Sequence, residues 1–312
     1  MKVRTALRLL LPALLLLACH RKPATAKADP YGKDSAPILL ARAKVYLQNG
    51  KWEEGRRMLR SIEERLPSSS EFPQAKLLIG DSFFYSATPS YPEAVVEYKS
   101  YLNYFPRSDK RDYVLFRIAL CHFAAIEGPE RDQAETHQAI SAFQDLLREA
   151  PGSTYAVESK AMITQCWRRL AESELMVGVF YVNARTYAPA ERRLKSLLET
   201  YPDYVDRERA YYYLAEALRR KGVDPDERKA FQKRYLAEAG KEDMAALTRE
   251  ENERYQEAYG TFSEAENRRN QLEARGYYEK LVESYPSSPW AQRASDRLVE
   301  MGRTGLKEEL DS

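Results

Sequence analysis

The sequence has few of the residues that catalytic and metal sites use most often. It contains three histidines and three cysteines in 312 residues. None of the histidines (His20, His122 and His137) stands in a spacing typical of a metal site or an activated nucleophile, such as HExxH. Cys121 and Cys166 lie in apolar helical stretches, which favours buried thiols over a disulfide, although an oxidising compartment would permit the bond. We therefore predict no catalytic centre, metal site or cofactor.

An excess charge of one sign is also missing. The formal net charge is +2, and three of the basic residues lie within the first 18 residues, which we expect to be removed, so 46 basic and 47 acidic residues remain. Without a basic surface field, nucleic acid is not an expected partner. No alternating pattern typical of a strand follows Ser35, so the predicted fold class is all-α.

The amino-terminal segment combines a basic start, MKVRTALR, with the apolar run LLLPALLLLA and then Cys19. The run is too short for a stable membrane-spanning helix. An ending of Leu-Leu-Ala-Cys resembles the bacterial lipobox, in which the cysteine becomes the lipidated first residue. We expect residues 1–18 to be a removed signal peptide, Cys19 to carry N-palmitoyl and S-diacylglycerol groups, and residues 19–34 to form a flexible tether. The alternative is an ordinary signal peptide that contains a cysteine.

A repeated pattern ends at five prolines, each of which would terminate a helix. Twelve residues before each proline the sequence has a small residue, and eight and five residues before it a larger apolar or aromatic one. The prolines are Pro67, Pro106, Pro151, Pro202 and Pro286, and the small residues are Gly55, Ala94, Ala139, Ala190 and Ala274. A small residue at a fixed distance from a terminal proline is typical of the second helix of a tetratricopeptide hairpin.

This pattern predicts a right-handed tetratricopeptide-repeat solenoid of about five to six helical hairpins with a carboxy-terminal capping helix. Residues 35–222 form the main part of the solenoid, and residues 223–312 add further helical hairpins and the cap. Gly178 lacks bulk where the two helices of the fourth hairpin approach each other. Between Pro202 and Pro286 we expect an irregular hairpin, residues 207–221 and 226–239. A long charged helix, roughly residues 242–269, would then open the last hairpin, and a helix over residues 289–301 would cap the stack.

Two segments carry a resemblance beyond the repeat pattern: AISAFQDLLREAPGSTYA and RLAESELMVGVFYVNARTYAPAERRLKSLLETYP. Together with the lipobox they resemble the outer membrane protein assembly factor BamD family. The resemblance implies an outer membrane lipoprotein on the periplasmic face, part of the machinery that inserts β-barrel proteins. Its implied partners are the POTRA domains of BamA, other subunits of that machinery, the carboxy-terminal β-signals of unfolded barrels, and the membrane through the lipid anchor.

The resemblance also implies residue roles. Arg193 matches the family arginine that pairs with a POTRA carboxylate, and Arg185 lies at the turn before the same helix; the alternative for both is a solvated arginine. For the β-signal groove we predict a set of ring-bearing residues in the first two repeats, some of which could instead be core. The set is Tyr46, Trp52, Phe83, Phe84 and Tyr91.

Two further alternatives remain open at the level of sequence. Periplasmic lipid-anchored tetratricopeptide scaffolds of the Tol-Pal system or of cell-wall machinery share the fold, and fold alone does not choose between these functions. In the carboxy-terminal extension, Tyr255, Tyr259 and Phe262 form an aromatic stripe at helical spacing, which is either core or a docking surface for an additional assembly subunit.

Overall fold

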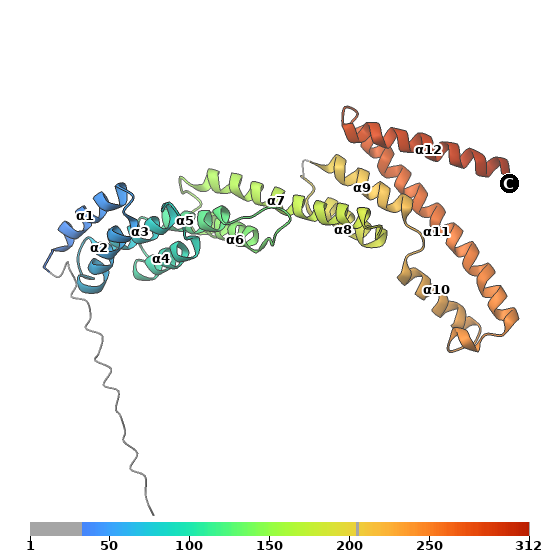
Figure 1. Cartoon of the computed structure of the whole chain (residues 1–312), viewed down its shortest axis with the longest axis horizontal. Helices are drawn as coiled ribbons and strands as arrows, with labels where there is room; N and C mark the ends of the chain where they lie inside the picture. Colours follow the sequence, from blue (N-terminus) through green and yellow to red (C-terminus); the bar gives the residue numbers. More distant parts are fainter. Residues whose placement is uncertain (1–32, 204–205, 312) are drawn as a thin grey trace, which may run out of the picture. The chain divides into compact units, whose positions relative to one another are not determined.

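The computed structural model describes residues 33–203 and 206–311, and the side chains up to residue 302 (Figure 1). The predicted signal peptide, Cys19 and the tether up to residue 32 lie outside the described residues. All regular elements in the described ranges are helices, which confirms the all-α fold class. None of the helices within these ranges is both long enough and apolar enough to cross a membrane.

The described residues form two compact units, which are divided after residue 87. In the first unit, α1 (Ala36–Gln48) and α2 (Trp52–Arg65) form a hairpin, and α3 (Phe72–Phe84) packs against α2. Gly50 turns the chain between α1 and α2 with a φ of 71°. A Cβ atom on Gly55 would lie 2.6 Å from the Leu47 side chain, so a larger residue would require Leu47 to shift.

The second unit contains nine helices among the described residues. They are α4 (Tyr91–Tyr104), α5 (Arg111–Ala124), α6 (Ala134–Glu149), α7 (Ala156–Asn183), α8 (Tyr187–Thr200), α9 (Arg207–Arg220), α10 (Pro225–Glu238), α11 (Arg249–Ser284) and α12 (Pro289–Asp311), with a short 3-10 helix, η1 (Met244–Ala246). From α4 to α9, each helix packs against the next along the chain. Cys121 and Cys166 are buried thiols, as the sequence predicts.

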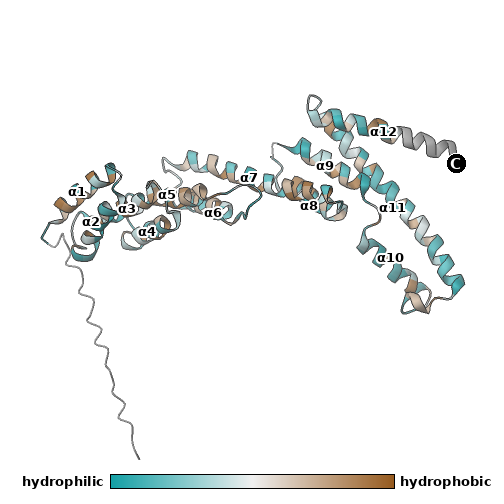
Figure 2. Ribbon diagram, viewed as in Figure 1, coloured by the Kyte–Doolittle hydropathy of each residue, from teal (hydrophilic) through white to brown (hydrophobic). Residues whose placement is uncertain are grey.

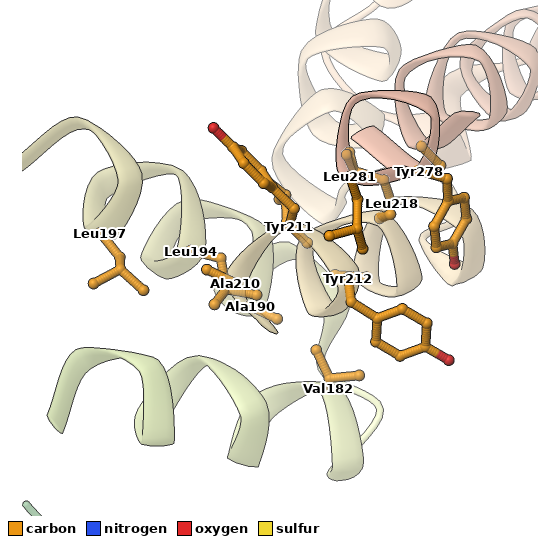
Figure 3. Close-up of a cluster of buried hydrophobic side chains, with 14 of the residues drawn as sticks. Val182, Ala190, Leu194, Leu197, Ala210, Tyr211, Tyr212, Leu218, Tyr278 and Leu281 are labelled. Carbon is orange, nitrogen blue, oxygen red and sulfur yellow. The ribbon is translucent and has the colours of Figure 1, made fainter. Parts of the chain in front are cut away.

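The five prolines end helices where the sequence places them. Each of α2, α4, α6, α8 and α11 stops two residues before its proline. The small residues twelve positions before the prolines are all buried, as are the larger ones at eight and five positions. In α8 these are Ala190, Leu194 and Leu197, which pack with Val182 of α7 and with residues of α9 (Figure 3). The repeat pattern therefore predicts these buried core positions correctly.

The pairing of helices after Pro202 differs from the prediction. The helices at 207–221 and 226–239 exist, but α9 packs mainly against α8 and α11, so the predicted α9–α10 hairpin is wrong. The predicted break near Arg269 is also wrong, because α11 is one helix of 36 residues. The carboxy-terminal part of α11 is the second helix of a hairpin whose first helix is α9.

The remaining residues, 223–269, form an insertion in this fifth hairpin, which we call the arm. It contains α10, η1 and the amino-terminal part of α11, and most of its ribbon has the colour of hydrophilic residues (Figure 2). The aromatic stripe of α11 faces α10: the Phe231 ring stacks on Phe262 at 4.7 Å between centroids and lies 5.9 Å from Tyr255, which is buried. The stripe is therefore the core of the arm. The capping helix is confirmed and extends to Asp311.

Candidate interaction sites

The turn between α7 and α8 places Arg185 in an uncommon backbone conformation. Its φ is 60°, and among the described residues it is the one non-glycine residue with a positive φ. Its amide donates to the Val182 carbonyl and the next amide, that of Thr186, donates to the Tyr181 carbonyl. Gly50 and Gly240 occupy the same position in two other turns with the same hydrogen bonds.

An arginine at this position costs backbone energy that a glycine does not, on the order of 1 kcal/mol. The Arg185 side chain is exposed, and it has no hydrogen bond or ion pair within the described part of the chain. A strained residue whose side chain contributes nothing to the fold is a candidate for an intermolecular contact.

Arg193 lies about 10 Å along α8 from its first residue, at 1.5 Å per residue. Its Nη1 donates to both carboxylate oxygens of Glu174 on α7, at 3.0 and 2.8 Å. The pair is half-exposed, and the other donors of the guanidinium have no partner among the described residues. Arg193 is thus fixed in place by Glu174 and still presents donors to solvent, whereas the sequence alone predicted either a solvated or a partner-bound arginine.

Close packing and a buried charge network hold α8 in position. A Cβ atom on Gly178 would lie 2.6 Å from Leu194, so α7 and α8 approach closely there. Lys195 of α8 bridges Glu191 at 2.7 Å and Glu273 of α11 at 2.6 Å, and Glu191 also accepts from Lys221 at 2.9 Å. Burial by itself raises the pKa of Glu191, but the hydrogen bonds from the two lysines outweigh it and hold the pKa below its ordinary value.

Two apolar side chains near this turn were not singled out by sequence. Phe180 is 65% exposed and Met176, one turn earlier on α7, is 37% exposed. Their spacing of four residues on one helix face was the available signal, but the same spacing also marks core positions, so it did not distinguish exposed from buried residues.

The predicted ring-bearing residues are shared between the two compact units. Tyr46, Trp52, Phe83 and Phe84 lie in the first unit and Tyr91 in the second, and all five are half-buried. The Arg56 guanidinium lies 4.4 Å from the centroid of Phe83, Lys51 lies 5.5 Å from that of Tyr46, and Phe84 contacts Tyr85 edge to face at 5.1 Å. Each of the five rings therefore keeps an exposed part, and their role in a groove stays a prediction.

A third charged cluster joins α9, α11 and α12. The Glu216 carboxylate is 3% exposed and accepts from the Tyr278 hydroxyl at 2.6 Å and from Arg297 Nε at 3.0 Å. Arg220 and Arg219 lie 2.5 and 3.2 Å from the same carboxylate. Burial by itself raises the pKa of Glu216, but the hydrogen bonds from Tyr278 and Arg219 outweigh it and hold the pKa below its ordinary value. The cluster fixes the capping helix to the last hairpin.

Within the described ranges, no group of three or more His, Cys, Asp or Glu residues is arranged to hold a metal ion. The recurring features are stacked helical hairpins and a buried small residue in each second helix. These features define a helical-repeat scaffold of the tetratricopeptide class.

Comparison with known proteins assigns the family. The model of the YfiO outer membrane lipoprotein family matches residues 34–233, and a tetratricopeptide repeat model matches residues 244–288. The chain belongs to the YfiO family of outer membrane lipoproteins.

Similar curated proteins carry the name outer membrane protein assembly factor BamD. The protein of Caulobacter vibrioides is 26% identical over 197 residues, which cover 63% of this chain and 64% of that protein, just under two thirds of its length. The protein of Rickettsia prowazekii is 26% identical over 63% of this chain and 80% of its own length. For that of Haemophilus influenzae the identity is 25%, over 70% of this chain and 84% of the relative.

Proposed function

We propose that this chain is an assembly factor for outer membrane β-barrel proteins and acts as a scaffold, not as an enzyme. The observation that carries the proposal is the family match over residues 34–233, which spans α1 to α9 and the first part of α10. The relatives bear the name of an outer membrane protein assembly factor. Lipidation of Cys19 would hold the scaffold at the periplasmic face of the outer membrane.

The α7–α8 hairpin is the proposed docking site for a POTRA domain of BamA. Arg193 keeps donors available while Glu174 holds its guanidinium in place, which lowers the entropy lost on binding a carboxylate. Arg185, exposed and held at the turn, adds a second cation to the same hairpin. Charge pairs of this kind set orientation and partner choice at interfaces.

The half-buried rings of the first unit are the proposed contacts for the β-signal of an unfolded barrel. An extended segment with a terminal aromatic residue needs apolar contact with polar groups at its edges. Phe83 beneath Arg56 and Tyr46 beside Lys51 supply both kinds of group. Phe84, outside the repeat positions, is the residue whose crosslinking to a β-signal peptide tests this assignment.

Co-purification of BamA with the tagged full-length chain tests the docking site. We expect Arg193→Glu to lower BamA recovery at least about tenfold, a loss of about 1.4 kcal/mol or more. Arg168→Glu, at an exposed position of α7, is the matched control and should leave recovery unchanged. Equal recovery with Arg193→Glu at normal protein levels would contradict the assignment.

Glu174→Gln separates binding from positioning. It removes the intramolecular partner of Arg193 but keeps the guanidinium, so BamA recovery should stay within a few-fold of the original. If Glu174→Gln instead abolishes recovery as Arg193→Glu does, Arg193 acts only by joining α7 to α8.

Depletion of the chain should lower the level of folded barrels and leave septal wall enzymes unaffected; the reverse result would favour a cell-wall scaffold.

A further inference from the structure

The arm carries a basic surface that the fold does not use. On α10, Arg228, Lys229, Lys233 and Arg234 are all exposed. Lys229 and Lys233, four residues apart, share one side of the helix, and Arg228 and Arg234 flank it on either side; we call the four the α10 basic face. Within the described part of the chain, Lys229 has one weak ion pair, to Asp226 at 3.9 Å, and the other three have none. Two cations of α11 in the arm behave differently, since Arg249 pairs with Glu253 at 3.1 Å and Arg254 pairs with Glu250 at 2.6 Å.

Aromatic rings of the arm core hold two of these cations in place. The Arg228 guanidinium lies 5.3 Å from the centroid of Tyr259, and that of Arg234 lies 5.7 Å from the centroid of Phe231. A guanidinium that is stacked on a ring keeps its planar set of donors in one orientation. Because its donors are held in fixed orientations, such a surface is suited to binding carboxylates.

The base of the arm is tied to the solenoid. Asp224 begins α10 with a capping box and lies 3.6 Å from Arg192 of α8. Within the arm, Arg269 of α11 pairs with Glu227 of α10 at 2.8 Å, and α11 continues without a break from the arm into the hairpin. The arm therefore presents its basic face from a fixed position, which reduces the cost of binding.

A membrane surface is the less suitable occupant for this face. An amphipathic helix binds a bilayer by inserting its apolar side chains. In α10 these side chains already contact α11: Phe231 stacks on Phe262, the Tyr235 hydroxyl donates to the Glu251 carbonyl, and Leu236 is buried. Between the cations, the exposed Ala230 and Ala237 leave room for the close approach of a protein surface.

We propose that the α10 basic face docks an acidic surface of another protein subunit of the envelope assembly to which this chain belongs. The inference rests on the proposed function, because that function supplies the other subunits. It concerns a face separate in sequence from Arg185 and Arg193.

The test uses the tagged full-length lipoprotein, purified from envelopes in mild detergent, with each co-purifying assembly subunit quantified by mass spectrometry. We expect Lys233→Glu/Arg234→Glu to lower the recovery of one subunit at least about tenfold. Arg249→Glu/Arg254→Glu, with the same charge change on the same arm, should leave every subunit unchanged. Replacing exposed acidic residues of the affected subunit by lysine should restore its recovery.

Three outcomes overturn the inference. If Lys233→Glu/Arg234→Glu recovers every subunit as the original chain does, the basic face is only solvated, and the proposed function stands. If the original chain recovers no assembly subunit, the proposed function fails as well. If unlipidated Cys19→Ser chain floats with phosphatidylglycerol-containing vesicles and Lys233→Glu/Arg234→Glu abolishes this while subunit recovery is unchanged, the occupant is the membrane.

Discussion

In the α7–α8 hairpin the chain reverses within three residues, Ala184 to Thr186, whereas in the α9–α11 hairpin the reversal includes the whole arm. The core positions are nevertheless equivalent. Twelve, eight and five residues before the terminal proline, α8 has Ala190, Leu194 and Leu197, and α11 has Ala274, Tyr278 and Leu281, all buried. The core positions, and not the length of the connection, therefore determine how the two helices of a hairpin pack.

The two hairpins differ in how their charged side chains are paired and how deeply these pairs are buried. The buried Tyr278 stands where α8 has Leu194, and its hydroxyl needs an acceptor, which Glu216 of α9 supplies. Three arginines then compensate the buried carboxylate. In the α7–α8 hairpin the bridging pair, Glu174 with Arg193, remains half-exposed. A polar ring in this core position thus needs a buried hydrogen-bond partner, which an aliphatic residue does not.

The largest effect on stability is expected from a substitution that breaks this network. Glu216→Gln removes the buried charge that three arginines and Tyr278 share, and should lower the free energy of unfolding by about 2–4 kcal/mol. Glu174→Gln, the matched change in the other hairpin, should cost less than about 1 kcal/mol because the pair is half-exposed. Chemical denaturation of both variants measures the difference, and equal costs would contradict the comparison.

The same network predicts a pH dependence. The pKa of Glu216 lies below its ordinary value of 4.5 in the folded state, so its stabilisation is complete above that value and is lost as the pH falls through the folded-state pKa. The stability difference between the original chain and Glu216→Gln should therefore be constant at neutral pH and shrink below pH 4.5. A difference that instead grows on acidification would show that burial outweighs the hydrogen bonds.

A further prediction concerns the close packing of helices at glycine positions. Gly178→Val places a side chain where Leu194 lies 2.6 Å from the Cβ position, and should cost about 1–3 kcal/mol. A Cβ atom added at Gly276 of α11 would have no neighbouring atom within 4 Å, so Gly276→Ala should raise the free energy of unfolding by up to about 1 kcal/mol. Thermal unfolding of the two variants should shift in opposite directions.

The turn of the α7–α8 hairpin gives a smaller effect. Arg185→Gly removes the backbone strain of an arginine in the left-handed conformation. It should raise the free energy of unfolding by about 0.5–1 kcal/mol. The same variant should weaken BamA recovery, since the guanidinium is lost. A variant that is both less stable and fully active in binding would remove the argument for a functional arginine at this turn.

The smallest expected effect comes from removing the arm. Deletion of residues 223–269 leaves Lys221-Gly222-Asn270 as a three-residue connection, with a glycine at the position of Gly50 and Arg185. The shortened chain should keep the α9–α11 hairpin and lose no more than about 0.5 kcal/mol, because the length of a connection weakly affects stability. Circular dichroism and thermal unfolding measure this; loss of cooperative unfolding would show that the arm is required for the fold.

The repeat positions could be predicted because each second helix carries its own signals. A proline fixes its end, and a small residue twelve positions earlier marks its contact with the first helix. The first helices have no comparable signal, so the partner of the last second helix was assigned incorrectly. The sequence around Arg269 contains no residue that stops a helix, and α11 continues through it.

The candidate sites were predictable in part for the same reason. Arg185 and Arg193 were found by resemblance, but the pairing of Arg193 with Glu174, 19 positions away, depends on how α7 and α8 pack. The exposure of Phe180 likewise depends on which face of α7 the neighbouring helices leave uncovered.

The helical class, the five helix ends and the small residues in the core follow from the amino-acid sequence, because they depend on backbone restriction by proline and on contacts close along the chain. The pairing of α9 with α11, the insertion of the arm after Gly222 and the exposure of the α10 cations became visible only in the folded chain. These features depend on contacts between residues far apart in sequence, and local side-chain patterns do not specify such contacts.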